Sequence, residues 1–457
     1  MTPPRTRRRP LACVMTAAAL AAGALIAATA VVPQRARAQD SGTQAAPQAA
    51  AADGVGAEAG AGGSGWCARI PPGFGHPPAN LTPLALRVLD PSIEPVQTTD
   101  GLIHLAYIAQ VTNTQTTPAD IASVVPVDAL AGFAPTGRNS PTDAQGNDVA
   151  GQVELFATAQ FPGPLDTPSF TASVPAGNAG LMFFDVTYTD PAQIPRLLSH
   201  AITLASPNGG AGTPALTNPV PVGCKQLAVL HPPLVGQGWL ALHGCCRVAY
   251  HRTDALLAFN GTPHTSEEFA IDYIQVGPNG TCCYGPVTDP NSWYDYGSPV
   301  LAAAPGVVVS VTGGIPDNNP VGTLPPFDPA HSQGNNVVED VGAGRYVFYA
   351  HLQPGSIPAS VRAGARLGAG DMIGRLGNSG GSAAPHLHFQ VADKPLPGDA
   401  SGLPFAFDAQ MLEGSVPEGI LANLAQGAVV PIDRTGAGLR RDLYPARNGV
   451  FGYDLPP

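Results

Sequence analysis

Charged side chains are scarce in this chain of 457 residues: only 12% of them are Asp, Glu, Lys or Arg. Helical patterns are also nearly absent. Instead, 54 glycines and 50 prolines break the chain into short segments, which favours strands, turns and loops over long helices. We therefore predict an all-β protein, and the chain length suggests two to three domains.

Basic patches are also missing from the part of the chain that follows the N-terminal segment. The formal net charge is -11 at pH 7. Proteins that bind nucleic acid rely on clustered Lys and Arg side chains to neutralise phosphates. We therefore exclude nucleic acid as a partner.

Residues 1–38 have the features of a signal peptide. Arg5 and residues 7–9 form a basic start, residues 11–32 are apolar, and Ala36-Arg37-Ala38 matches a cleavage site. The apolar run is long enough to span a membrane, so an uncleaved anchor is the alternative. Its alanine-rich composition is only weakly hydrophobic and favours cleavage. We expect a secreted, extracytoplasmic protein with no stable membrane insertion after cleavage.

Six of the seven cysteines follow the predicted signal peptide. An even number of cysteines in an exported chain predicts up to three disulfides. The two adjacent pairs are alternatives as metal ligands, but neighbouring cysteines rarely chelate one ion well. The six are Cys67, Cys224, Cys245, Cys246, Cys282 and Cys283.

Composition divides the chain into segments. Residues 39–65 hold almost no large apolar residue and are expected to be disordered. Residues 82–206 contain short alternating runs, such as 103–111, that predict a β-sandwich-like domain. The predicted division is a signal peptide (1–38), an Ala/Gly-rich linker (39–81), the sandwich (82–206), a second linker (207–235), a second β domain (236–410) and a tail (411–457).

A His-x-His sequence begins one of the predicted strands. Leu387 and Phe389 point to one face of this strand, and His386 and His388 point to the other. Two such imidazoles can serve one metal ion, one as ligand and the other beside the bound water. Alone, the pattern is weak, because strand histidines are more often solvated or hydrogen-bonded.

Two further strands supply groups of a suitable kind. Asp272 lies on a buried-looking strand at 269–274, where a lone carboxylate needs a partner such as a cation. His351 lies at the end of a strand at 346–352. Two imidazole nitrogens, one carboxylate oxygen and an open fourth position suit a hydrolytic zinc ion, which activates water and polarises a carbonyl.

Several motifs of the second domain follow one another in a fixed order. They are Asp272, the run YGSPVLAAAPGVV at 296–308, Tyr349-Ala350-His351-Leu352, Gly377-Asn378-Ser379-Gly380 and Pro385-His386-Leu387-His388-Phe389. In order and spacing, they resemble the M23 metallopeptidases, the lysostaphin-like group that is also called LytM domains. The similarity covers roughly 250–410, with an insertion at about 312–334.

This resemblance implies a small antiparallel β fold with a groove and a zinc ion held by His, Asp and His. It implies that Asp272 and His388 are ligands, and that His351 and His386 act on the water and the tetrahedral intermediate. The implied substrate is the peptide cross-link of bacterial peptidoglycan. Some relatives are instead non-catalytic modules that bind the cell wall or activate another hydrolase, and these usually lack one or more of the histidines.

The remaining ligand is open between two histidines. The commonest family pattern is His-x-x-x-Asp, but Glu268 stands four residues before Asp272. We favour His251, because its His-Arg context resembles family members with longer spacing. His264 lies in a polar loop and is the rival, and Glu268 is a third alternative as a carboxylate ligand.

Overall fold

The computed structural model describes residues 75–453, except 83, 144, 156–169, 207–211, 249, 255, 327, 329, 421–423 and 425. The predicted signal peptide and most of the first linker lie outside these residues. Nearly all of the regular structure consists of strands in antiparallel sheets, so the all-β prediction is confirmed. Among the described residues, no helix has the length and apolar character needed to cross a membrane.

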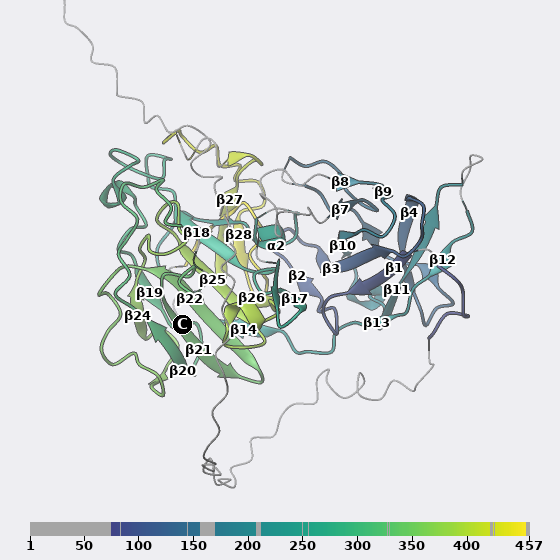
Figure 1. Cartoon of the computed structure of the whole chain (residues 1–457). Helices are drawn as coiled ribbons and strands as arrows, with labels where there is room; N and C mark the ends of the chain where they lie inside the picture. Colours follow the sequence, from purple (N-terminus) through teal and green to yellow (C-terminus); the bar gives the residue numbers. More distant parts are fainter. Residues whose placement is uncertain are drawn as a thin grey trace, which may run out of the picture.

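The first two sheets form one body, coloured purple to teal in Figure 1. The larger sheet has the order β1-β3-β10-β7-β8, with β2 paired to β3 and β6 paired to β10. Its strands are β1 (Leu84–Val88), β2 (Val96–Gln97), β3 (Ile103–Asn113), β6 (Arg138–Asn139), β7 (Val153–Leu155), β8 (Phe170–Thr171) and β10 (Ala179–Tyr188).

The smaller sheet has the order β12-β11-β4-β5, with β13 paired to β11 and β9 paired to β4. Its strands are β4 (Ala119–Asp128), β5 (Ala134–Pro135), β9 (Ser173–Val174), β11 (Leu197–Leu204), β12 (Ala215–Leu216) and β13 (Val220–Pro221). Tyr107 and Phe184 of the larger sheet share a core with Leu198 and Ile202 of the smaller one. Two sheets with one shared core make a β-sandwich.

The sandwich continues beyond its predicted end at residue 206. Strands β12 and β13 lie in the segment predicted as a linker at 207–235, and both pair with β11. They have only two residues each, with flanking Pro, Gly and Asn, so the sequence of this segment is that of a connection. Pairing to β11 makes it part of the sheet.

The second body is built on a ten-stranded sheet, coloured green to yellow in Figure 1. Its order is β23-β20-β21-β22-β25-β18-β15-β29-β27-β28. The strands are β15 (Trp239–Leu242), β18 (Ile271–Gln275), β20 (Gly306–Thr312), β21 (Asn335–Gly342), β22 (Arg345–Leu352), β23 (Arg366–Leu367), β25 (Leu387–Ala392), β27 (Gln410–Ser415), β28 (Gly438–Arg440) and β29 (Gly449–Gly452).

Short elements complete this body. Three strand pairs lie outside the large sheet, and α2 is a helix of one turn. These elements are the parallel pair β14 (Ala228–Leu230) and β26 (Phe405–Phe407), the pair β16 (Leu256–Phe259) and β17 (Thr262–Thr265), the pair β19 (Pro299–Leu301) and β24 (Met372–Arg375), helix α2 (His251–Asp254), and the 3₁₀ helices η2 (Pro191–Gln193, in the sandwich), η3 (Pro290–Ser292) and η4 (Pro397–Asp399).

The segment predicted as a separate tail is part of the large sheet. Strands β27, β28 and β29 all lie within 410–452, and β29 pairs with β15 near the middle of the sheet. The glycines of β29 conceal its strand character, and its pairing partner lies about two hundred residues earlier.

Strand β25 separates the core from the site, as its alternating pattern predicts. Leu387, Phe389 and Val391 belong to the large core of the second body, together with Tyr349 of β22. Phe389 packs edge-on against Tyr349, with ring centroids 5.6 Å apart. The opposite face of β25 is therefore free to carry histidine.

Cysteines follow the disulfide prediction only in part. Cys245 and Cys246 form a disulfide between sequence neighbours, and Cys224 is also disulfide-bonded. Cys282 and Cys283 are instead buried thiols, so the prediction that the six cysteines form disulfides is wrong for these two residues.

Candidate metal centre

The carboxylate of Asp272 lies at the centre of a group of imidazoles. Its Oδ2 atom is 2.7 Å from Nδ1 of His243 and 3.3 Å from Nε2 of His251. Its Oδ1 atom is 3.0 Å from Nδ1 of His388 and 3.4 Å from Nε2 of His386. Four histidines from three segments of the second body therefore converge on one carboxylate.

Strand pairing and two connections bring these side chains together. Strand β18 lies between β25 and β15 in the sheet, and Asp272 is directly opposite His388. His386 immediately precedes β25, and His243 immediately follows β15. His251 is the first residue of α2. The sheet thus fixes the carboxylate and one imidazole, and the adjoining connections supply the rest.

Backbone oxygens fix the tautomers of two of these histidines. Nδ1 of His251 lies 3.0 Å from the carbonyl oxygen of Ala270, and Nδ1 of His386 lies 2.8 Å from that of Ala384. A carbonyl only accepts, so each Nδ1 must donate its N–H. In the neutral imidazoles, both Nε2 atoms then turn a lone pair towards Asp272.

The side-chain amide of Gln390 fixes the tautomer of His388. Nε2 of His388 lies 2.7 Å from Oε1 of Gln390, whose own amide nitrogen donates to the carbonyl of Ser266. The amide oxygen therefore accepts the N–H of Nε2. In the neutral ring, Nδ1 faces Asp272 without a proton at 3.0 Å.

His351 completes the ring of imidazoles on the side of His386. The two ring centroids are 4.6 Å apart, and Nδ1 of His351 donates to the carbonyl of Ser379 at 2.7 Å. His351 has a φ of 60°, an uncommon left-handed conformation for a non-glycine residue. Burial, with a further contribution from the neighbouring imidazoles, holds the pKa of His351 well below its usual value, which leaves the ring neutral.

The negative charge of the Asp272 carboxylate has to be compensated by a proton or by a cation. Burial would raise the pKa of Asp272, but the surrounding imidazoles, His251 foremost, hold it well below its usual value. Burial lowers the pKa of His388, yet Glu267 and Asp272 outweigh this and raise it to about 9. Without a metal, a shared proton therefore compensates the carboxylate, and a metal cation can take its place.

The donor set fits zinc. Zinc binds imidazole nitrogen and carboxylate oxygen, and the far nitrogen of a histidine ligand usually donates to an oxygen. His251 and His388 meet both conditions, and Asp272 supplies the oxygen. Lone pairs that face a carboxylate repel it, and a cation between them removes this repulsion.

The structure brings together most of the residues that the sequence analysis selected. Asp272, His251, His386 and His388 are in direct contact, and His351 adjoins them. Their individual roles remain predictions.

The two alternatives to His251 lie elsewhere. His264 is on β17 and pairs with Asp399, with Nε2 and Oδ1 3.2 Å apart. Glu268 pairs with Arg252 in a fully buried contact of 3.1 Å.

Two side chains at the site had no assigned role in the sequence analysis. His243 touches Asp272, and burial lowers the pKa of His243 to about 4, so its neutral ring donates to the carboxylate. Glu267 offers a carboxylate oxygen within 4.8 Å of nitrogens on His251 and His388. No motif marks either residue, because their proximity depends on the pairing of β15 with β18 and on the turn before β18.

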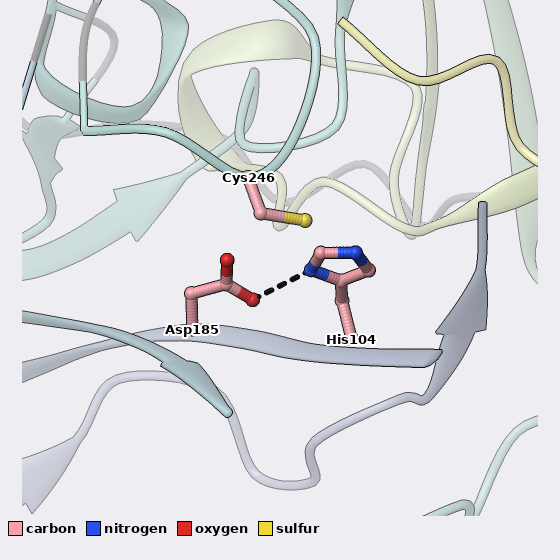
Figure 2. A group of neighbouring side chains, drawn as sticks. All are labelled: His104, Asp185 and Cys246. Carbon is pink, nitrogen blue, oxygen red and sulfur yellow. Dashed lines mark hydrogen bonds and ion pairs between the residues drawn. The ribbon is translucent and has the colours of Figure 1, made fainter. Parts of the chain in front are cut away.

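A second group of potential ligands lies between the two bodies. Figure 2 shows His104 and Asp185 of the sandwich beside Cys246. The sulfur of Cys246 is bonded to Cys245, so it is not a thiolate, and metal ligation by cysteine requires the thiolate. Asp185 instead pairs with Nδ1 of His104 at 2.8 Å. This group is therefore an interdomain contact.

A buried carboxylate surrounded by imidazoles on an antiparallel sheet offers the kinds of ligand atom that zinc binds in proteins. Residues 293–399 match the model of peptidase family M23, so this segment of the chain belongs to that family. The match includes His351, His386 and His388, and it begins after Asp272. No curated protein matches the chain.

Solved structures with similarity to the chain include three peptidases. The catalytic domain of the prophage-encoded M23 protein EnpA (A109H mutant) from Enterococcus faecalis is 20% identical, with 38% of this chain and 93% of that chain covered and a TM-score of 0.22. The lysostaphin catalytic domain from Staphylococcus simulans is 23% identical, with 32% of this chain and 80% of that chain covered and a TM-score of 0.19. A zinc-containing peptidase from Vibrio cholerae is 12% identical, with 65% of this chain and 80% of that chain covered and a TM-score of 0.22. At such TM-scores the family assignment rests on residues 293–399.

Proposed function

We propose that this protein is an exported zinc endopeptidase that hydrolyses peptide cross-links of bacterial peptidoglycan. The M23 segment supports a peptidase. The substrate class follows from the resemblance of the motifs to lysostaphin-like enzymes. Export follows from the signal peptide predicted at 1–38.

One observation supports the proposal most strongly: four imidazoles converge on one buried carboxylate. A binding module gains nothing from burying these groups together, because polar and charged groups are expensive to remove from water. A zinc ion held by His251, Asp272 and His388 removes this cost. When bound, zinc supplies a Lewis acid for the substrate carbonyl and lowers the pKa of its water.

The remaining histidines are suited to proton transfer. His351 and His386 keep their Nδ1–H groups bonded to the carbonyls of Ser379 and Ala384, so each Nε2 is available. An available imidazole nitrogen can accept a proton from the attacking water and return it to the leaving amine. Once protonated, the same nitrogen can donate to the oxyanion.

The test is the release of free amines from purified peptidoglycan by the zinc-loaded protein. We expect release by the wild type and by His264→Ala, a histidine variant away from the centre. We expect background release after chelation and by Asp272→Asn. Wild-type protein that binds peptidoglycan but releases no amines from several cross-link types would favour the non-catalytic alternative.

A further inference from the structure

We propose that the sandwich domain is part of the metal centre, because Arg252 uses the sandwich to position the ligand His251. This inference rests on the proposed function, since it assigns His251 to the metal. It gives the sandwich a role in metal binding and makes Arg252 a positioning residue.

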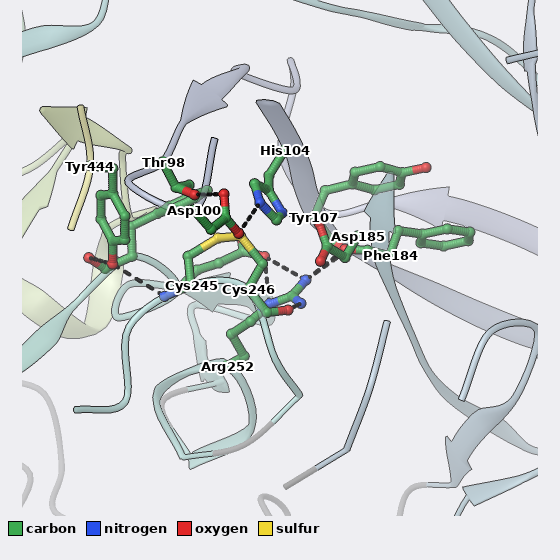
Figure 3. The surroundings of a disulfide bond; sticks show 12 residues. Thr98, Asp100, His104, Tyr107, Phe184, Asp185, Cys245, Cys246, Arg252 and Tyr444 are labelled. Atoms are coloured by element: carbon green, nitrogen blue, oxygen red, sulfur yellow. Dashed lines mark hydrogen bonds and ion pairs between the residues drawn. A yellow bond between two sulfur atoms is a disulfide. The ribbon is translucent and has the colours of Figure 1, made fainter. Parts of the chain in front are cut away.

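Arg252 has a buried guanidinium with acceptors on all sides. Figure 3 shows it between the sandwich and the segment of Cys245 and Cys246. Nη2 donates to the carbonyls of Tyr107 on β3 and Phe184 on β10, at 3.1 and 3.0 Å. Nη1 donates to the carbonyl of Cys246 at 2.7 Å. The planar fork of arginine thus joins two central strands of the sandwich to the second body.

Charge compensation for Arg252 comes from the second body. Nε and Nη2 lie 3.3 and 3.1 Å from Oε1 of Glu268. Glu268 stands in the turn before β18, four residues before Asp272. It is the partner of Arg252, the residue that follows His251. Arg252 therefore connects the two ligand-bearing segments.

Helix α2 needs such a connection. It has four residues, and a helix of one turn gains too little from its own hydrogen bonds to be stable alone. Its first residue must nevertheless hold an imidazole in a fixed position against Asp272 and Ala270. Arg252 is 1% exposed and makes the densest set of polar contacts in α2 among the described side chains. The sandwich therefore determines where His251 lies.

A lysine at position 252 tests this positioning without leaving Glu268 unpaired. Arg252→Lys keeps the positive charge, but one ammonium group cannot reach four separate acceptors. We expect zinc affinity, measured by competition with a chelator, to fall by about 10–100-fold, the usual cost of losing a residue that orients a ligand. The visible spectrum of the Co²⁺-loaded variant should change, because the His251 nitrogen is displaced.

Two controls separate positioning from general loss of stability. Arg247→Met removes another interdomain bond, from Nη1 to the carbonyl of Asp143 at 2.9 Å, together with the ion pair between Arg247 and Glu418. Ile202→Ala weakens the sandwich core from β11 of the smaller sheet, whereas the sandwich carbonyls that Arg252 binds lie on β3 and β10 of the larger sheet. We expect both to bind zinc with wild-type affinity and to keep the wild-type Co²⁺ spectrum.

The outcomes distinguish this inference from the proposed function. Wild-type protein that takes up no zinc would contradict the proposed function itself. If the wild type binds zinc and folded Arg252→Lys matches it in affinity and Co²⁺ spectrum, the positioning role is wrong. If Arg252→Lys does not fold, the double variant Arg252→Met/Glu268→Gln, which removes both charges, takes its place. Its zinc affinity and Co²⁺ spectrum are then measured in the same way.

Discussion

At the scale of single residues, the site depends on oxygens that face the far side of each imidazole. The carbonyls of Ala384 and Ser379 keep His386 and His351 in one tautomer. A histidine held in this way presents the same nitrogen to the site in every molecule. Proton transfer and metal binding both depend on such fixed orientation.

Loss of the proton-transfer histidines should separate activity from metal binding. We expect His351→Ala and His386→Ala to keep zinc and fold but to lose about 10²–10⁴-fold in the rate of cross-link hydrolysis, the usual contribution of a positioned acid or base. Amine release from peptidoglycan, with zinc content measured on the same preparations, checks this. Retention of wild-type rates by both variants would remove their assigned role.

His243 should tune the metal ligand without being essential. Its Nδ1–H holds Oδ2 of Asp272 at 2.7 Å. We expect His243→Ala to weaken zinc binding by about tenfold, at the low end for a lost supporting hydrogen bond to a ligand. Chelator competition on His243→Ala and His243→Gln measures this. Unchanged affinity in both would mean that the contact is incidental.

At the scale of elements, β25 has one face for the core and one for the site. Phe389 is fully buried, with ring centroids 5.2 Å from Phe405 and 5.9 Å from Phe407. The rigidity of this aromatic cluster keeps His388 opposite Asp272.

Truncation of Phe389 should therefore destabilise the whole second body. We expect Phe389→Ala to lower the free energy of unfolding by about 3–5 kcal/mol, as is usual for a buried phenylalanine. Met411→Ala on β27, where the side chain is 36% exposed, should cost much less. Urea denaturation of both variants tests this, and equal losses would argue against a packed core beneath the site.

At the scale of the whole molecule, an ion-pair cluster of the sandwich faces the second body. His104 lies between the carboxylates of Asp100 and Asp185, which are also in the sandwich, and beside Cys246 of the second body (Figure 3). Burial lowers the pKa of His104, but the hydrogen bonds and charges of these carboxylates outweigh it and raise the pKa to about 9. His104 is therefore an imidazolium at neutral pH.

This ion-pair cluster should weaken in alkali. Because the pKa of His104 is higher in the folded than in the unfolded chain, its stabilisation is complete below about pH 6.5 and is lost as the pH rises through 9. The shift corresponds to roughly 3 kcal/mol. We expect the difference in unfolding free energy between wild type and His104→Asn to shrink between pH 6 and pH 9.5. A difference that does not change with pH would contradict the charged state.

The sequence predicted those features that local patterns encode. Alternation identified the strand of His388 and the residues on its two faces, and the motif order identified the M23 segment. The place of β29 in the sheet and the contacts of Arg252 with the sandwich were not predictable, because both depend on partners more than sixty residues away. Proximity of that kind arises from the tertiary fold and leaves no local pattern.

The most direct test of the central claim is the zinc content of the purified protein and of two histidine variants. We predict about one zinc per chain, from the single set of His251, Asp272 and His388 as ligands. His264→Ala should retain that zinc and His251→Ala should lose most of it. A wild type without zinc, or loss of zinc from His264→Ala alone, would contradict the account.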